Sequence, residues 1–374
     1  MPRLLSYFLA LLICSSLLSC KQRTTASLPA TDSLAFSYAS LLHITRTDSY
    51  AVAVVRDAWN PQRTLQRYLL LPHNAPAPPH IHEATIVRIP LQRAVAFSSI
   101  HASLFAELGK SNHLCGLCDV PYLYNSELRK RLENGLLTDM GAAMTPNIEL
   151  IAAAKPDALF VSPFENAGHG QIARLGIPII ECADYMETSP LGRAEWMRFY
   201  GLLFGCEAKA DSLFSEIEKE YLALSKIGKE QPVKPKLLCD TKSGSAWYVP
   251  GGNSTLGQIF SDAGADYLFA HKRESGSVCL SFEHVYRQAH DADIWLIKYG
   301  AKEPLTYESL SADFKSYEAF KPWKSRNIYA CNTFHVPYYE ETPFHPERLL
   351  RNLIHIFHPQ LLPDNTHHYY QPIE

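Results

Sequence analysis

The sequence has little net charge. Its 374 residues include 35 lysines and arginines and 38 aspartates and glutamates, a formal net charge of −3. Loss of residues 1–19, whose charged residue is Arg3, would leave 34 basic and 38 acidic residues, a difference of −4. A nucleic-acid partner requires a strongly basic face. We therefore expect no nucleic-acid partner.

The sequence also lacks the short motifs of common catalytic and nucleotide-binding sites. It contains no G-x-x-x-x-G-K-[ST], H-E-x-x-H or G-x-S-x-G, and Gly251, Gly252 and Gly257 do not form a dinucleotide fingerprint. We therefore expect no catalytic residue and no cofactor.

Long apolar runs are missing after residue 20. No stretch there reaches the ~18 consecutive apolar residues that a membrane helix needs. Arg3 followed by the apolar run 4–18 predicts a signal peptide over residues 1–19. The run ends in Leu17-Leu18-Ser19-Cys20, which is similar to a bacterial lipobox and implies lipidation of Cys20. An ordinary secretory signal is the alternative. Residues 20–34 are polar and small, and we expect a tether to the membrane there.

Cysteine is present but does not form a metal-binding spacing. Seven of the nine cysteines follow Cys20, an odd number that cannot pair completely within the chain. Cys115 and Cys118 form a C-x-x-C without a second such pair at zinc spacing. Most of these cysteines lie in apolar surroundings, where a small buried side chain is the simpler interpretation. We expect no metal site.

Short apolar strands alternate with helices in two regions, residues 91–192 and 227–363. Such alternation is typical of parallel sheets covered on both faces. Between them, residues 193–226 have the apolar spacing of a long amphipathic helix or a helix pair. The predicted fold class is α/β, with two similar lobes joined by a long helix or a helix pair. Residues 35–90 form an N-terminal extension with strands at 50–55 and 67–71, and residues 364–374 form a tail.

One pattern occurs in both lobes. Asn147 is followed by Glu149, a short helical stretch and an apolar strand, and Ser281 is followed by Glu283, a similar helix and the strand at 294–297. The two glutamates are 134 residues apart. Each lobe therefore presents one carboxylate in the first turn of a helix, where the helix dipole favours it.

Several stretches resemble the periplasmic binding proteins for iron-siderophores, haem and vitamin B12. They are 93–109, 146–161, Leu175-Gly-Ile-Pro-Ile-Ile180, Pro250-Gly-Gly-Asn-Ser-Thr-Leu-Gly257 with Ala263-Gly-Ala-Asp266, and His345-Pro-Glu-Arg-Leu-Leu350 with His358-Pro359. Together they cover about residues 91–363. The resemblance implies two Rossmann-like lobes with parallel sheets, joined by a long rigid helix, with a ligand cleft between the lobes. It also implies delivery of the ligand to an ABC permease and its ATPase. The chain would be a periplasmic lipoprotein.

The resemblance assigns a role to the repeated acids. In the family, one glutamate from each lobe pairs with arginines of the permease, and Glu149 and Glu283 match those positions. An exposed carboxylate can bind an arginine through two hydrogen bonds. The alternative is that both residues only favour the helix N-terminus.

Ligand contacts are expected from the loops at the carboxyl ends of the strands, where sheets of this type bind ligands. Aromatic side chains favour large planar ligands. The candidates are Ser99, His101, Asp119, Tyr122, Met140 and Phe164 in the first lobe and Trp247, Tyr248, Tyr299, His335 and Tyr338 in the second.

Two other functions remain open. A tetrapyrrole-processing enzyme would need an ionisable cluster in the cleft, for which His101, Asp119 and His335 are candidates. A protein that binds a bare metal ion would need three or four convergent His, Asp or Glu ligands. The aromatic content of the candidate loops makes this second alternative less favoured than binding of a metal chelate.

Overall fold

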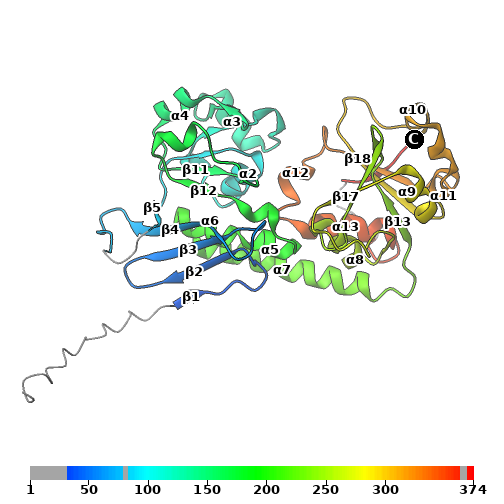
Figure 1. Cartoon of the computed structure of the whole chain (residues 1–374), viewed down its shortest axis with the longest axis horizontal. Coiled ribbons are helices and arrows are strands. Elements are labelled where there is room, and N and C mark those ends of the chain that lie inside the picture. The colour runs from blue at the N-terminus through cyan, green and yellow to red at the C-terminus, as the bar shows by residue number, and fades with distance from the viewer. Residues whose placement is uncertain (1–31, 79–82, 363–368) are drawn as a thin grey trace, which may run out of the picture.

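The structure is a computed structural model that describes residues 32–78, 83–362 and 369–374. The predicted signal peptide, Cys20 and most of the tether lie outside the described residues. Two α/β lobes stand side by side above a layer of helices, and a separate sheet lies below the first lobe (Figure 1). No helix in the described residues combines the length and apolar character needed to span a bilayer.

The N-terminal lobe (N-lobe) contains a parallel sheet of order β12-β11-β6-β7-β8. Its strands and the hairpin beside it are β6 (Ala94–Ala96), β7 (Leu114–Leu117), β8 (Thr138–Asp139), β9 (Gly141–Ala142), β10 (Thr145–Pro146), β11 (Ala158–Val161) and β12 (Ile179–Glu181). Its helices are α2 (Ser99–Glu107), α3 (Ser126–Glu133) and α4 (Ile148–Ala154). β6 and β11 are fully buried, as expected for strands covered on both faces.

The C-terminal lobe (C-lobe) contains a sheet of order β16-β13-β18-β19-β20, parallel except for β20. Its strands are β13 (Lys236–Cys239), β16 (Asp266–Tyr267), β18 (Ile294–Tyr299), β19 (Ile328–Asn332) and β20 (Gln371–Pro372). A small antiparallel sheet joins β14 (Lys242–Ser243), β15 (Ala246–Pro250) and β17 (Ser277–Leu280). The helices are α8 (Thr255–Asp262), α9 (Phe282–Ala289), α10 (Tyr307–Asp313), α11 (Lys321–Lys324), α12 (Tyr338–Glu341) and α13 (Pro346–Phe357).

Three consecutive helices connect the lobes along their base. They are α5 (Pro190–Glu195), α6 (Met197–Phe204) and α7 (Glu207–Lys229). Gly205 ends α6 with a φ of 63°, a left-handed conformation that glycine adopts without strain. The segment expected as one long helix or a helix pair is therefore interrupted near residue 205, and α7 alone continues beneath the C-lobe (Figure 1).

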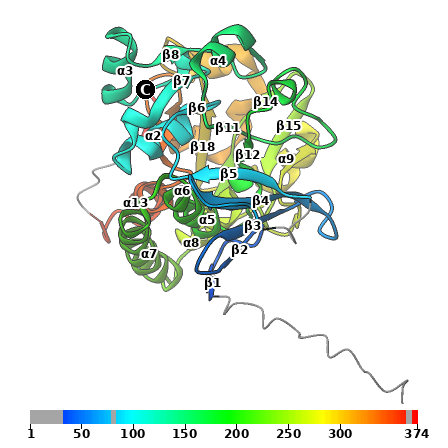
Figure 2. The same ribbon diagram turned by 90° about the vertical axis from the view of Figure 1, so that its left-hand side faces the viewer.

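The N-terminal extension folds as a five-stranded sheet of order β1-β2-β3-β4-β5. The strands are β1 (Asp32–Leu34), β2 (Leu42–Arg46), β3 (Ala51–Arg56), β4 (Thr64–Pro72) and β5 (Thr85–Ile89). The sheet lies below the N-lobe sheet (Figure 2). The Tyr68 hydroxyl donates to the carbonyl oxygen of Ile179 (3.0 Å) and accepts from the Glu181 N–H (2.7 Å), which ties β4 to β12.

Two buried carboxylates hold the extension to the helical layer. Glu195 accepts hydrogen bonds at 2.8–2.9 Å from the backbone N–H groups of Ser37, Tyr38 and Ala39. Glu187 accepts from the backbone N–H groups of Ser40 and Leu41 and from Nε1 of Trp196 at 2.9–3.0 Å. Because both carboxylates are buried, these donors provide the hydrogen bonds that burial of a charge requires.

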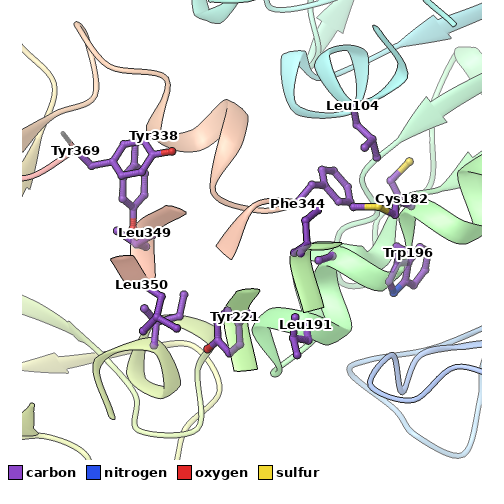
Figure 3. Close-up of a cluster of buried hydrophobic side chains, with 14 of the residues drawn as sticks. Leu104, Cys182, Leu191, Trp196, Tyr221, Tyr338, Phe344, Leu349, Leu350 and Tyr369 are labelled. Atoms are coloured by element: carbon purple, nitrogen blue, oxygen red, sulfur yellow. The ribbon is translucent and has the colours of Figure 1, made fainter. Parts of the chain in front are cut away.

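One hydrophobic core crosses the boundary between the lobes. Phe344, in the C-lobe segment before α13, is buried and contacts the rings of His101 and Tyr200 in edge-on geometry at 6.0 and 6.1 Å between centroids. Figure 3 shows Phe344 among Leu104, Cys182 and Trp196. The lobes are therefore packed against each other as well as linked by α6 and α7.

Candidate functional site

Each lobe has a point at which the order of its strands reverses. The N-lobe chain moves from β6 to β7 on one side and later to β11 on the other. In the C-lobe, β13 lies between β16 and β18 in the same way. Parallel sheets bind ligands outside the carboxyl ends of the strands at such a point. The two most favourable positions for a ligand in this fold are therefore the carboxyl ends of β6 and β11 and those of β13 and β18.

A pocket of about 190 Å³ has walls from both lobes, and we call it the tyrosine pocket. Its lining residues are Ser98, Ser99, Ile100, Asp119, Tyr122 and Tyr124 from the N-lobe and Thr333, Val336, Tyr339 and Glu340 from the C-lobe. The structure thus brings together the sequence candidates Ser99, Asp119 and Tyr122.

The position of Asp119 is fixed by the backbone. The residue directly follows Cys118 at the end of β7 and adopts a left-handed conformation, with φ of 56°. Its N–H donates to the carbonyl oxygen of Gly141 (2.9 Å), and its Oδ1 accepts from the N–H of Ala143 (3.0 Å). These bonds hold the β9–β10 hairpin next to the end of β7 and orient the Asp119 carboxylate.

A second pocket, of about 490 Å³, is formed by the N-lobe alone, and we call it the N-lobe pocket. Phe97 follows β6, Ser162 follows β11, and both line it together with the candidate Phe164, whose side chain is 54% exposed. His169 also lines the pocket, and its Nε2 lies 2.6 Å from Oε1 of Glu181. Since Asp119 and Ala143 are hydrogen-bonded and each lines one pocket, the two pockets are neighbours on the same sheet edge.

Helix α12 bridges the lobes by packing against α2. The N–H of Tyr124 donates to Oε2 of Glu340 (2.7 Å), and the Tyr124 hydroxyl donates to the carbonyl oxygen of Thr333 (2.9 Å). The Glu340 side chain is buried, and this burial raises its pKa. The contact separates the tyrosine pocket from a second interlobe pocket of about 420 Å³ that contains His345.

His345, directly before α13, contacts two carboxylates, of which that of Glu107 belongs to the N-lobe. Its Nε2 lies 2.7 Å from Oε2 of Glu107 on α2, and its Nδ1 lies 2.9 Å from Oε1 of Glu347 on α13. Burial by itself would lower the pKa of His345, but the hydrogen bonds to Glu107 and Glu347 raise it to about 9. His345 is therefore a cation at neutral pH.

We expect His345 to make the stability of the protein depend on pH. Because its folded pKa of about 9 exceeds the unfolded value of 6.5, its contribution is complete below pH 6.5 and is lost as the pH rises through 9. The contribution amounts to at most about 3 kcal/mol. The melting temperature of the parent protein should fall between pH 6.5 and 9.5 more than that of His345→Gln. The exposed His290→Gln is the control and should follow the parent, and equal falls in parent and His345→Gln would contradict the assignment.

Five of the sequence candidates are buried. Ser99 nevertheless lines the tyrosine pocket, whereas the other four line neither the tyrosine pocket nor the N-lobe pocket, which argues against the expectation that they contact a ligand. His101 is 2% exposed, and its Nε2 lies 2.8 Å from Oδ1 of Asp184. Met140 is fully buried and packs tightly against Gly116. A Cβ atom added at Gly116 would lie only 2.2 Å from the Met140 Cε atom. Tyr338 is 5% exposed, and Trp247 is fully buried.

Trp247 belongs to the core of the C-lobe. Its ring stacks on that of Trp295 with 5.9 Å between centroids, and its Nε1 donates to the carbonyl oxygen of Cys239 (3.0 Å). Tyr248, the next residue on β15, is 48% exposed. Successive strand residues face opposite sides, so Tyr248 occupies the outer face while Trp247 fills the core.

The other C-lobe candidates have local partners. The Tyr299 hydroxyl accepts from the N–H of Leu305 (2.8 Å), and Tyr299 lines a separate C-lobe pocket. His335 Nε2 donates to the carbonyl oxygen of Lys302 (2.8 Å). His101, Asp119 and His335 are thus held by separate partners, so the ionisable cluster expected for an enzyme is not assembled.

Sequence reasoning missed several residues at the site that carry a polar or charged group. Tyr124, Tyr339 and Glu340 line the tyrosine pocket, and Lys298 lies near the end of β18 with its Nζ 5.6 Å from the centre of the Tyr339 ring. Tyr339 and Glu340 follow β19 by only a few residues, so the carboxyl-end rule could have included them. Their orientation on α12 could not be read from the sequence.

One cluster in the described residues has the composition of a metal site. His101, Cys182 and Asp184 are buried and their ligand atoms lie within 4.8 Å of one another. However, Asp184 Oδ1 already accepts from the Tyr200 hydroxyl (2.8 Å), and Oδ2 lies 3.3 Å from Nε of Arg193. The cluster is therefore a hydrogen-bonded core network, and it gives no support to the alternative of a bare metal-ion site.

Cys115 and Cys118 are both free, as are the other five cysteines after Cys20. Burial raises the pKa of both thiols, that of Cys118 to about 12. Because the thiolate is the reactive and metal-binding form, this shift gives no support to a redox or metal site at Cys115 and Cys118.

The two repeated acids are both exposed. Asn147 caps α4 by accepting from the Leu150 N–H (3.0 Å), and Ser281 caps α9 by accepting from the His284 N–H (3.3 Å). Hydrogen bonds from its own backbone N–H and from Ser281 lower the pKa of Glu283. The same spacing occurs at α3 and at α10, where Thr306 precedes Glu308. The spacing alone therefore does not distinguish docking from capping.

Two lobes on a helical base, with a cleft between the carboxyl ends of their strands, define a class of solute-binding proteins rather than enzymes. The chain belongs to the periplasmic binding protein family, whose model matches residues 101–332. Two uncharacterized lipoproteins of Methanocaldococcus jannaschii are 26% and 23% identical over 324 and 316 residues. Each comparison covers 82% of this chain, and 76% and 80% of the respective relative.

Solved structures show the same fold at low sequence identity. An Fe³⁺-hydroxamate transport protein of Saccharomonospora viridis has a TM-score of 0.56 at 17% identity, covering 71% of this chain and 92% of that one. The siderophore-binding protein FhuD of Vibrio cholerae with Fe³⁺-Desferal has a TM-score of 0.53 at 15% identity (71% and 99% covered). IsdE of S. aureus with heme has a TM-score of 0.55 at 17% identity (71% and 98% covered).

Proposed function

We propose that this protein is the substrate-binding component of an ABC importer that captures a metal chelate and delivers it to the membrane permease and its ATPase. The observation that carries the proposal is the tyrosine pocket, which has walls from the carboxyl ends of both lobes. Membership of the periplasmic binding protein family supports it.

The chelate would be a siderophore complex, haem or cobalamin. Ligands of this size need several hundred Å³, more than the 190 Å³ of the tyrosine pocket. The neighbouring N-lobe pocket, with Phe97 and Phe164 on its walls, adds about 490 Å³. A chelate that spans both pockets would contact Ser99, Asp119 and Tyr122 with one side and the aromatic N-lobe pocket with the other.

Docking on the permease would use Glu149 and Glu283. Both carboxylates are exposed, and they lie on different lobes, on α4 and α9. An exposed carboxylate of this kind can accept two hydrogen bonds from one arginine. A pair of such contacts would orient the cleft toward the permease.

Attachment to the membrane would occur through lipid on Cys20 after cleavage of residues 1–19. The sequence before Cys20 supports this proposal, and both Methanocaldococcus relatives are named lipoproteins. The protein would then work in the periplasm as a membrane-anchored lipoprotein.

Titration of the chain from residue 21 with haem, cobalamin and ferric siderophores tests the proposed function. The chain has five tryptophans, whose fluorescence a coloured chelate quenches on binding. We expect saturable one-to-one quenching by one chelate class, with a Kd in the micromolar range or below. Bovine serum albumin titrated in parallel controls for non-specific quenching. Failure of every chelate to bind would refute the proposed function.

A further inference from the structure

The charged side chains that line the tyrosine pocket are both acidic, and each lobe contributes one. Asp119 belongs to the N-lobe and Glu340 to the C-lobe. Both are held in place, Asp119 by the Ala143 N–H (3.0 Å) and Glu340 by the Tyr124 N–H (2.7 Å). A ligand between the lobes would therefore meet a carboxylate on each side.

Aromatic rings accompany these carboxylates. Tyr122 and Tyr339 line the same pocket and are 70% and 54% exposed. The face of an aromatic ring attracts cations, and sites for ammonium groups combine several such rings. Carboxylates and rings in this pocket thus act on a ligand charge in the same direction.

The cation Lys298 lies nearby but has its own counter-charge. Its Nζ is 5.2 Å from the centre of the Tyr338 ring and 5.6 Å from that of Tyr339. Asp240, at the end of the adjacent strand β13, attracts the Lys298 ammonium. A second cation, Arg129, lies 5.6 Å from the centre of the Tyr124 ring and donates to the carbonyl oxygen of Leu123 (2.6 Å). Neither cation lines the pocket, whose charged lining residues are Asp119 and Glu340.

We propose that the tyrosine pocket receives a positively charged group of the ligand, so that the protein selects cationic over neutral chelates and discriminates against anionic ones. This inference rests on the function proposed above. It narrows the chelates to those that carry an amine or another cationic group outside the metal-binding core. Chelates surrounded by free carboxylates would be repelled by Asp119 and Glu340.

A charge series on one scaffold tests the inference. Ferric desferrioxamine B has a terminal ammonium, its N-acetyl derivative is neutral there, and its N-succinyl derivative has a carboxylate. The metal core is the same in all three, so differences in Kd report the terminal charge. We expect affinity to fall about tenfold at each step from ammonium to acetyl to succinyl. The titrations would include haem and ferric citrate as anionic chelates of other shapes.

Two variants connect the effect to the pocket. Asp119→Asn and Glu340→Gln keep an oxygen acceptor for the Ala143 and Tyr124 N–H groups while removing one charge each. Each should reduce the preference for ammonium over succinyl by about tenfold, mostly through weaker binding of the ammonium form. Glu308→Gln, an exposed carboxylate on α10, is the matched control and should leave the preference unchanged.

The outcomes separate this inference from the proposed function. Equal binding of the three derivatives, or a preference that both pocket variants retain, would overturn the charge selection while leaving a chelate-binding protein. Tight binding of haem or ferric citrate, with no binding of cationic or neutral chelates, would also overturn the charge selection and leave a chelate-binding protein. If no chelate binds at all, the proposed function fails and the inference fails with it.

Discussion

Alanine at both Glu149 and Glu283 should abolish chelate import without changing the Kd for the chelate. Each substitution would remove a charge-assisted contact to an arginine of the permease, and the pair should reduce uptake about 100-fold or more. The single variants should be intermediate. Uptake of a radiolabelled chelate by cells measures the effect on transport, and titration of the purified variant measures the Kd.

Glu308→Ala is the appropriate control for this experiment. Glu308 stands two residues after the capping Thr306 of α10, as Glu149 and Glu283 stand after the caps of α4 and α9. It should have no effect on uptake. If Glu308→Ala reduced transport as strongly as the double variant, or if the double variant still transported, the glutamates would have only the capping role.

Trp247→Ala should destabilise the protein by about 3–5 kcal/mol because it removes a large, fully buried ring. The cavity would lie against Trp295, and the carbonyl oxygen of Cys239 would lose its donor. Thermal unfolding monitored by circular dichroism measures the change. Below its lowered melting temperature, the variant should bind the chelate with the Kd of the parent protein.

Tyr248→Ala provides the comparison, because the neighbouring side chain on β15 is 48% exposed. Its effect on the free energy of unfolding should be within about 1 kcal/mol. If Trp247→Ala kept the stability of the parent protein but bound the chelate more weakly, the Trp247 ring would belong to the ligand site. Its structural role would then be refuted.

The sequence predicted the α/β lobes because their signals are local. The strand expected at 294–297 lies within β18, and the short helix expected after Ser281 is α9. The rule that ligands bind at the carboxyl ends of strands can also be applied to the sequence. It requires only the residue at which each strand ends. Ser99, Asp119 and Tyr122, three of the residues that it selected, line the tyrosine pocket, and their contact with a ligand remains a prediction.

Side-chain direction could not be predicted in the same way. In the short strand β15, a shift of one residue would exchange the positions of Trp247 and Tyr248, and the surrounding loop residues made exposure of either side chain plausible. His101 lies on α2 only two residues after Ser99, yet it points into the core toward Asp184. The burial of these side chains depends on which distant elements pack against each face of the strand or helix. The residues next to them in the sequence do not contain that information.

The N-terminal extension shows the same limit on a larger scale. The sequence predicted two strands there, which correspond to β3 and β4. The other three strands are short or mixed in polarity, so their pairing depends on contacts beyond their own residues. Glu195, which binds the backbone of residues 37–39, is more than 150 positions away in the sequence.

The carboxylate contacts of the extension determine where the smallest stable fragment of this chain begins. A fragment starting at residue 91 would retain all the residues matched by the family model, yet Glu187 and Glu195 would lose the backbone donors that compensate their burial. The face of β12 that Tyr68 covers would also be exposed. A protein expressed for binding or crystallisation studies should therefore start before β1, because the N-terminal extension supplies the donors to these buried carboxylates.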